Sequence, residues 1–358
     1  MPNPSNFAQL PKIELHCHLD CCVRLETAAE LAQEMKIEVY EPLRTALVAP
    51  ELCHDLADYL MRVDLAVALM QTPESLTRIA HELVEDFAAD GVIYGEVRFA
   101  PQLHRRNGLT LQQVLDEVYK GLLLGQKQFN VRTGLILCCL RHEPAELSVE
   151  VAKLAVANPD KVCALDLAGD EARYPGRPHA AAFRLAREAG LRRTVHAGEA
   201  AGPASVREAL DELFAERIGH GVRVEQDPQL VERVRSQAIP LEMCPKSNVQ
   251  TRAAVSLDGH PISRLLRQGV RVTVNTDART TTETSITREF ERLASWHAWG
   301  LAEFWQCQRN AAEAAFAAPA ICEGLLRKIT SAEAEYSPLT RPSAPRHNGS
   351  AKDVSSES

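Results

Sequence analysis

Several features that mark large classes of proteins are absent from this chain of 358 residues. No apolar run approaches the roughly 18 residues that cross a bilayer as a helix, so we expect no membrane-spanning segment. Residues 1–6 combine neither a charged stretch nor an apolar stretch, so we expect no secretory signal. The formal net charge is -8 and no basic stripe occurs, which argues against a nucleic-acid partner.

The ten cysteines follow no recognisable pairing pattern. No CxxC pair occurs, so a structural zinc cage is not indicated. A chain of this length needs no disulfide framework to fold. Cys138, Cys139 and Cys163 lie in apolar runs, as small core residues do. We therefore expect a reducing, cytoplasmic setting.

Apolar segments of strand character alternate with helical patterns along the chain. The predicted strands are residues 13–20, 91–99, 131–140, 162–167, 193–196, 217–220, 240–244 and 271–275. The helical patterns are residues 25–36, 52–89 with an interruption near 72–73, 111–129, 145–157, 179–189, 203–215, 227–237, 260–268 and 284–328. Such alternation predicts βα units and a parallel sheet. Eight units predict a (β/α)8 TIM barrel, with additional helices after the first strand and at the C-terminus. A doubly wound open sheet is the alternative, but no GxGxxG follows any strand.

Length alone would suggest two or three domains, yet closed α/β barrels run this long as one. We expect one barrel domain over residues 1–331. Residues 332–358 are rich in Ser, Pro, Glu and Lys. Such a tail buries too little apolar surface to offset its ordering entropy, so we expect it to be disordered.

Polar side chains gather at the ends of four predicted strands, where the active site of a parallel barrel lies. They are His16, His18 and Asp20 on the first, His196 and Glu199 on the fifth, His220 on the sixth and Asp277 on the eighth. Residues two apart on a strand point the same way, so His16 and His18 can converge on one ion while Cys17 faces the helices. Three imidazoles and a carboxylate suit zinc or another borderline divalent metal. The end of the fourth strand has no lysine to bridge a second metal, which favours one metal per chain.

Each of these residues alone also has an ordinary structural explanation. A lone histidine on a strand is more often a core or surface residue than a ligand. Glu199 suits the N-terminal turn of a helix, and Asp277 suits an N-cap. Co-occurrence at four strand ends favours a site over these explanations. Six further histidines we interpret as surface or loop residues: His54, His81, His104, His142, His179 and His260.

Five segments form motifs: PKIELHCHLD at 11–20, TVHAGE at 194–199, RIGHG at 217–221, EMCPKSN at 242–248 and VNTD at 274–277. Together they resemble the adenosine deaminase family of the metal-dependent amidohydrolase barrels, over about residues 11–328. The resemblance implies one zinc ion, held by His16, His18, His196 and Asp277. It implies that Glu199 donates a proton to the purine ring nitrogen beside the amino-bearing carbon. His220, helped by Asp277, would orient and deprotonate the zinc-bound water.

The resemblance also implies a small-molecule purine nucleoside as the partner. Gly169 would offer its backbone N–H to another ring nitrogen, and Asp20 would accept a hydrogen bond from the ribose 5′-hydroxyl. The expected reaction is hydrolytic deamination of adenosine, and of 2′-deoxyadenosine, to the 6-oxo purine and ammonia. No oligomeric state is indicated.

One position departs from the family pattern. Family members carry a second Asp after the zinc-binding one, and it hydrogen-bonds the five-membered ring of the purine. Here that position is Ala278, and its neighbours Arg279 and Thr280 are candidates to supply the missing contact. The alternative substrates are a modified adenine nucleoside, such as 6-amino-6-deoxyfutalosine, and free adenine, although Asp20 argues against adenine. A barrel without activity, serving in binding or structure, is a third reading that the intact histidine and carboxylate set opposes.

Overall fold

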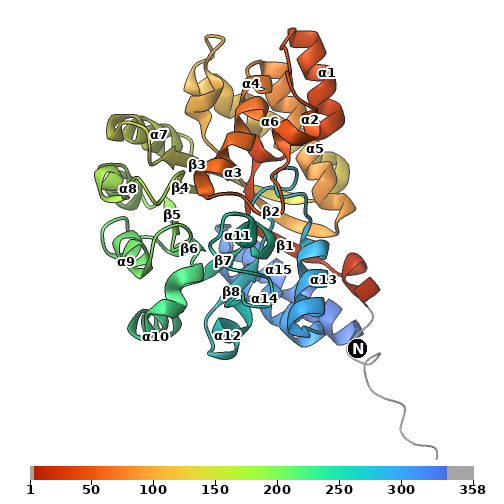
Figure 1. Ribbon diagram of the computed structural model, residues 1–358, viewed down its shortest axis with the longest axis vertical. Helices are drawn as coiled ribbons and strands as arrows, with labels where there is room; N and C mark the ends of the chain where they lie inside the picture. Colours follow the sequence, from red (N-terminus) through yellow and green to blue (C-terminus); the bar gives the residue numbers. More distant parts are fainter. Residues whose placement is uncertain (1–3, 337–358) are drawn as a thin grey trace, which may run out of the picture.

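The computed structural model describes residues 4–336, in which eight parallel strands form a ring enclosed by helices (Figure 1). The strands pair in chain order from β1 to β8. They are β1 (Lys12–His18), β2 (Val92–Phe99), β3 (Arg132–Leu140), β4 (Ala164–Ala168), β5 (Arg192–Ala197), β6 (Arg217–His220), β7 (Leu241–Met243) and β8 (Val272–Val274). The predicted (β/α)8 TIM barrel is confirmed, because each predicted strand overlaps an observed one.

Contacts between the ends of β8 and β1 close the ring. A parallel bridge joins Cys17 to Asp277. The backbone N–H of His18 donates to the carbonyl of Asp277 over 2.7 Å, and the N–H of Asp277 donates to the carbonyl of His16 over 2.8 Å. The closure of the barrel therefore brings Asp277 beside the two histidines of β1.

Helices occupy the connections. They are α1 (Leu25–Met35), α2 (Leu43–Leu47), α3 (Leu56–Leu60), α4 (Asp64–Leu69), α5 (Pro73–Ala89), α6 (Leu111–Phe129), α7 (Ala145–Ala157), α8 (Ala180–Glu188), α9 (Pro203–Asp211), α10 (Pro228–Ser236), α11 (Pro245–Gln250), α12 (Ile262–Arg267), α13 (Ile286–His297), α14 (Leu301–Ala314) and α15 (Pro319–Tyr336). The extra helices predicted after the first strand are α1 to α5, and those at the C-terminal end include α14 and α15. Among the helices of residues 4–336, none is long and apolar enough to cross a bilayer.

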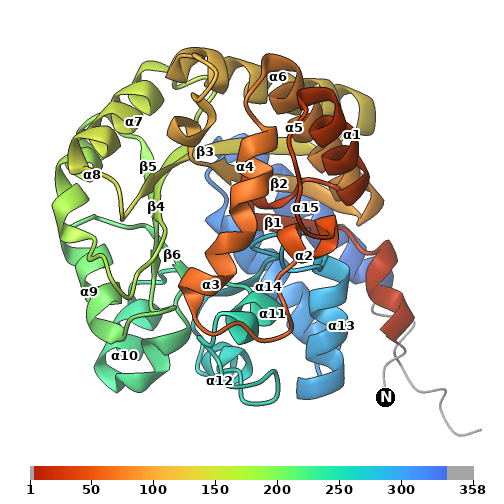
Figure 2. The same cartoon turned by 45° about the horizontal axis from the view of Figure 1, so that its top comes forward.

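The first excursion covers one end of the barrel. Figure 2 shows α3 and α4 in front of the strand ring, and their side chains form part of the wall of the cavity found there. α5 starts at a capping box in which Thr72 and Ser75 bond each other's backbone N–H. The predicted helical region 52–89 is thus divided, with its longest helix beginning at the interruption near 72–73.

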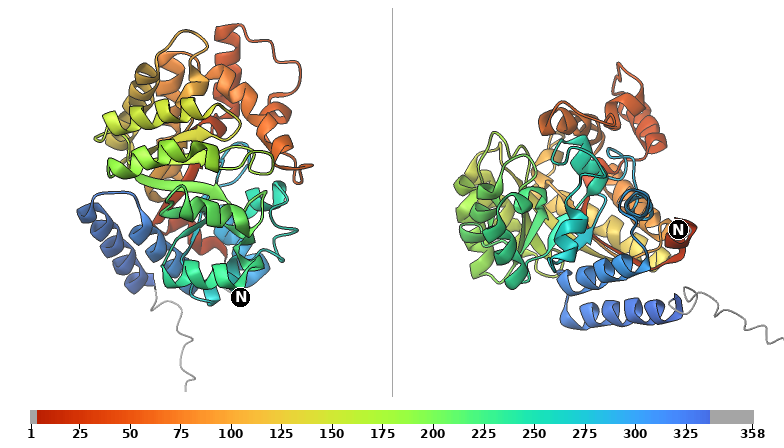
Figure 3. Two further views of the ribbon diagram at one scale, coloured as in Figure 1. Left: turned by 90° about the vertical axis from the view of Figure 1, so that its left-hand side faces the viewer. Right: turned by 60° about the horizontal axis from the view of Figure 1, so that its bottom comes forward.

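α14 and α15 lie side by side at the other end (Figure 3). Gln308 of α14 accepts the backbone N–H of Ile13 over 2.7 Å, and Asn310 donates to the carbonyl of Val272 over 2.9 Å. These hydrogen bonds join α14 to the first residues of β1 and β8. α14 therefore packs against the amino ends of these two strands.

Two parts of the sequence interpretation need correction. The short helices α2 and α11, of five and six residues, were not predicted. The last helix continues to Tyr336, five residues into the predicted tail. The rest of that tail, 337–358, lies outside the described residues.

Candidate active site

A cavity of about 230 Å³ opens at the carboxyl ends of the strands. The predicted site residues that line it are His18, Asp20, Gly169, His196, Glu199, His220 and Asp277. The eighth, His16, is fully buried and contacts this group. All eight residues that the sequence predicted for the site thus meet in one place.

The centre of the group is a cluster of buried imidazole and carboxylate atoms. Ligand atoms of His16, His196, His220 and Asp277 all lie within 4.8 Å of one another. His18 joins them through Nε2, which lies 3.1 Å from Nε2 of His196 and 3.5 Å from Oδ1 of Asp277. This cluster could hold a metal ion.

The donor atoms of the cluster fit a cation. Nε2 of His16 is buried and has no hydrogen-bond partner among the described residues. Burial, together with the charge of Arg98, lowers the pKa of His16 to about 4, so this ring is neutral and offers a lone pair. Burial would raise the pKa of Asp277, but the neighbouring imidazoles of His16 and His220 outweigh burial and hold it well below its usual range. Imidazole nitrogens and a carboxylate oxygen are ligands that zinc prefers.

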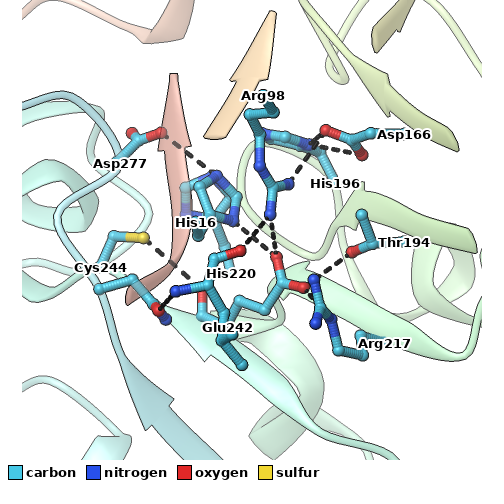
Figure 4. A network of polar contacts seen from close by, with 12 residues as sticks. His16, Arg98, Asp166, Thr194, His196, Arg217, His220, Glu242, Cys244 and Asp277 are labelled. Atoms are coloured by element: carbon cyan, nitrogen blue, oxygen red, sulfur yellow. Dashed lines mark hydrogen bonds and ion pairs between the residues drawn. The ribbon is translucent and has the colours of Figure 1, made fainter. Parts of the chain in front are cut away.

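Each of two histidines is oriented by a carboxylate behind it (Figure 4). Nδ1 of His16 lies 2.8 Å from Oε2 of Glu242, and Nδ1 of His196 lies 3.1 Å from Oδ1 of Asp166. An ionised carboxylate only accepts, so the hydrogen of each ring sits on Nδ1. Nε2 of both rings therefore faces the cluster, as in histidines that bind metals.

These two carboxylates belong to a charged network inside the barrel that the sequence interpretation missed. Arg98 and Arg217 both donate to Glu242, and Arg98 also donates to Asp166. Burial would raise the pKa of Glu242, but the two guanidinium groups outweigh burial and hold it well below its usual range. The available signal was a charged residue within an otherwise apolar strand, because such a residue needs a buried partner.

Two non-glycine residues of the cluster have left-handed backbones. φ is +62° at His220 and +64° at Asp277. L-residues seldom adopt this region, and it persists where the surrounding structure imposes it, often at functional sites. The backbone is bent at both positions where a side chain must turn into the cavity.

His220 is held from behind by an amide. Nδ2 of Asn248 donates to Nδ1 of His220 over 2.9 Å, while Oδ1 of the same amide accepts the N–H of Cys244 and a hydrogen from His260. An Nδ1 that accepts leaves the hydrogen of the neutral ring on Nε2. That atom faces the site and lies 3.5 Å from Oε2 of Glu199.

Glu199 stands on a loop that one buried carboxylate fixes. Glu171 accepts the backbone N–H groups of four successive residues, 198–201, over 2.6–3.0 Å. Thr251 donates to Oε1 of Glu199 over 3.0 Å. Burial raises the pKa of Glu199. A buried carboxyl that retains its proton is suited to act as an acid.

The ordinary explanations for two of these carboxylates are wrong. Helix α9 begins at Pro203, four residues after Glu199, so Glu199 is not in its first turn. Helix α13 is capped by Ser285, so Asp277 is not an N-cap. Both side chains line the cavity.

Asp20 and Gly169 also line the cavity. The backbone N–H of Ala100 lies 3.4 Å from Oδ2 of Asp20, and burial raises the pKa of Asp20 to about 6. Gly169 has φ +99°, and a Cβ there would lie 3.3 Å from Nδ1 of His142. Only glycine suits that backbone without displacing its neighbour.

Three histidines interpreted as surface or loop residues are in fact buried: His104, His179 and His260. Each ring has a polar partner that makes burial tolerable. Nδ1 of His104 lies 3.0 Å from the carbonyl of Met70, and Nδ1 of His179 lies 2.8 Å from Oγ of Ser148. His260 supports the amide behind His220.

The cavity wall beside Asp277 is apolar. Ala278 is buried in a cluster that includes Cys21, Leu56 and Tyr59. Arg279 does not line the cavity, and its guanidinium donates to the carboxylate of Asp90 over 3.2 Å. Thr280 does not line the cavity either. The suggestion that one of these two neighbours replaces the missing Asp is therefore wrong.

Comparison with known proteins agrees with this geometry. The family model described as adenosine deaminase matches residues 11–332. The chain belongs to the adenosine deaminase family. It is 39% identical over 329 residues to an adenosine deaminase of Clostridium perfringens strain 13, covering 90% of this chain and 99% of that one. It is 40% identical over 320 residues to an adenosine deaminase of Clostridium botulinum strain Hall, covering 88% and 95%.

Solved structures of other deaminases are similar to this chain as well. An adenine deaminase from Arthrobacter aurescens has a TM-score of 0.83 and 31% identity, covering 90% of this chain and 98% of its own. The apo N6-methyl-AMP deaminase from Arabidopsis thaliana has a TM-score of 0.83 and 27% identity, covering 93% and 100%. As a member of the family, the protein is a hydrolytic deaminase that acts on the C–N bond of a 6-aminopurine.

Proposed function

We propose that this deaminase converts adenosine and 2′-deoxyadenosine to the corresponding inosines and ammonia, with one zinc ion per chain. The observation that carries the proposal is the position of Glu199, whose Oε2 lies 3.5 Å from Nε2 of His220 at the edge of the histidine cluster. A proton donor and a polar group that can hold water thus share one cavity. Identity of 39% to a protein named adenosine deaminase supports the substrate.

The residues that would hold zinc are His16, His18, His196 and Asp277. A zinc ion lowers the pKa of a bound water to about 7 and so makes hydroxide available at neutral pH. His16 and His196 are prepared for this role by the carboxylates behind them, and Asp277 by its left-handed backbone.

Glu199 supplies the proton for the ring. Addition of water to the amino-bearing carbon breaks aromaticity and builds charge on the neighbouring ring nitrogen. Because burial raises its pKa, the Glu199 carboxyl can carry a proton to that nitrogen. The loop held by Glu171 keeps the carboxyl in place for this transfer.

His220 orients the attacking water. With the Asn248 amide donating to Nδ1, the neutral ring carries its hydrogen on Nε2 and can donate it to a water oxygen. A ring that donates from Nε2 can orient the water, so this arrangement supports that predicted role of His220. It supports less directly the other predicted role, removal of a proton from the water. The hydroxyl of Ser247 donates to Oδ2 of Asp277 over 2.6 Å, so Oδ1 is the oxygen that faces the histidine cluster.

Asp20 and Gly169 would position the nucleoside. Asp20 would accept the ribose 5′-hydroxyl, and the backbone N–H of Gly169 would donate to a ring nitrogen. Both line the same cavity as Glu199. A proton donor at one ring nitrogen and a backbone donor at another would fix the plane of the purine.

A second candidate substrate is a modified adenine nucleoside such as 6-amino-6-deoxyfutalosine. The specific observation is the apolar wall at Ala278, whose methyl group cannot make a hydrogen bond to a bound purine. Loss of one hydrogen bond costs roughly 0.5–1.5 kcal/mol of binding, and more if a buried polar atom is left unpaired. Contacts elsewhere on a larger substrate would offset that loss.

The decisive experiment combines metal analysis with an ultraviolet assay of purine deamination. Purified protein should contain about one zinc per chain and should deaminate adenosine. Ratios of kcat/KM for adenosine, 2′-deoxyadenosine, adenine and 6-amino-6-deoxyfutalosine then rank the substrates. Protein without bound metal, and without turnover of any of these purines, would refute the proposal.

A further inference from the structure

Arg98 of β2 is fully buried and extends into the interior of the barrel (Figure 4). Its Nη1 donates to Oδ2 of Asp166 over 3.0 Å. Its Nη2 donates to Oε2 of Glu242 over 2.8 Å and to the carbonyl of Leu15 over 2.7 Å. One planar group therefore fixes two carboxylates, one on β4 and one on β7.

Each of those carboxylates orients one histidine of the cluster. Oε2 of Glu242 lies 2.8 Å from Nδ1 of His16, and Oδ1 of Asp166 lies 3.1 Å from Nδ1 of His196. Oε2 of Glu242 accepts hydrogen bonds from both Arg98 and His16. A displacement of the guanidinium would therefore move the carboxylate and, with it, the His16 ring.

We propose that Arg98 is a positioning residue that couples the two histidines. By holding both carboxylates at once, it sets the orientation of His16 and His196 together, although these residues stand on β1 and β5. The inference rests on the proposed metal site, and its consequence is that the two histidines bind zinc as one unit.

The planar shape of the guanidinium is what this role requires. A lysine keeps the positive charge but carries all its N–H donors on one nitrogen, so it cannot reach Asp166 and Glu242 from two separate positions as Nη1 and Nη2 of Arg98 do. Arg98→Lys therefore removes the bridge and leaves a buried cation in place.

Arg217 supplies a matched control. It is equally buried and donates to Oε1 of Glu242, to Glu96 and to the carbonyl of Ala314. Within residues 4–336 it makes no hydrogen bond or ion pair with Asp166, so it does not link the carboxylates behind the two histidines. Arg217→Lys therefore disturbs the same charged network without breaking the bridge.

The first test is the affinity for Zn²⁺, measured by competition with a chelator. Loss of an outer partner of a metal ligand weakens binding about 10–100-fold, and we expect Arg98→Lys to fall in that range. Arg217→Lys should lower the thermal stability about as much as Arg98→Lys does, but it should weaken zinc binding much less than Arg98→Lys. With Co²⁺ in place of zinc, the visible spectrum should change in Arg98→Lys and not in Arg217→Lys. Equal zinc affinity in Arg98→Lys and wild type would overturn the inference.

A double-mutant cycle tests the coupling itself and does not depend on the folding of Arg98→Lys. Asp166→Asn and Glu242→Gln should each weaken zinc binding, and their combined effect should differ from the product of the two by about tenfold. If the two effects simply multiply, Arg98 does not couple the histidines. Wild-type protein that binds no Zn²⁺ at all would refute the proposed function instead.

Discussion

The hydroxyl of Thr251, just after α11, donates a hydrogen bond to Oε1 of Glu199 on the loop after β5. The two residues are 52 positions apart in the chain, and both are buried. A donor of this kind stabilises the ionised form of a carboxyl, so it opposes the effect of burial on the pKa of Glu199. The balance between these influences decides up to which pH Glu199 keeps its proton.

Removal of that donor should therefore change the pH profile. In Thr251→Val the ionised form of Glu199 loses a hydrogen bond, so its pKa rises further above the usual range. The protonated donor then persists to higher pH, and the alkaline limb of kcat should move up by about one pH unit. Thr251→Ser keeps the hydroxyl and should leave the limb in place. A limb that moves down in Thr251→Val would contradict the role of Thr251.

The proton donor itself can be removed with little change of shape. Glu199→Gln keeps the size of the side chain but carries no acidic proton, so kcat should fall by about 10²–10⁴. The cluster of His16, His196 and Asp277 is unchanged in this variant, so zinc content should remain that of wild type. Measurement of kcat beside metal content separates the two effects. Retention of most activity would remove Glu199 from the mechanism.

The sequence predicted the barrel and its rim because both depend on local signals. Polar residues that end an apolar strand, such as His196, can be recognised from their neighbours alone. The partners of Arg98 could not be predicted in this way, because Asp166 and Glu242 lie 68 and 144 residues away and their meeting depends on the closed ring. The burial of His260 was not predicted either, because its partner Asn248 belongs to the helix α11, which the sequence interpretation did not include.

Packing between α5 and α6 gives a prediction far from the site. A Cβ at Gly125 of α6 would lie 2.6 Å from Cβ of Val84 on α5. Alanine normally favours a helix over glycine by about 1 kcal/mol, but here the clash should dominate. We expect Gly125→Ala to reduce the free energy of unfolding by about 1–3 kcal/mol in denaturant titrations.

Gly324 is the control for this prediction. It lies inside α15, and the nearest atom to an added Cβ is Nη2 of Arg327 at 3.8 Å. With no clash, Gly324→Ala should stabilise the protein by about 0.5–1 kcal/mol. The same substitution should thus have opposite signs at the two positions. Stabilisation by Gly125→Ala would contradict the close contact of α5 and α6.

The choice of substrate can be tested at Ala278. An aspartate there would be buried among Cys21, Leu56 and Tyr59, and burial would favour its protonated form. A protonated carboxyl can donate to a ring nitrogen that the native methyl leaves without a partner. If adenosine is a poor substrate of the native protein, Ala278→Asp should raise its kcat/KM by about tenfold, the value of one hydrogen bond.

Two further variants isolate the hydrogen bond from other effects of size. Ala278→Asn also carries a donor and should raise kcat/KM for adenosine in the same direction, whereas Ala278→Val has none and should not. The new polar group should at the same time lower the free energy of unfolding by about 1–3 kcal/mol, because it replaces a methyl in an apolar cluster. Slower deamination of adenosine by both polar variants would show that no donor is missing at this wall. The native apolar surface would then be a contact that the substrate uses.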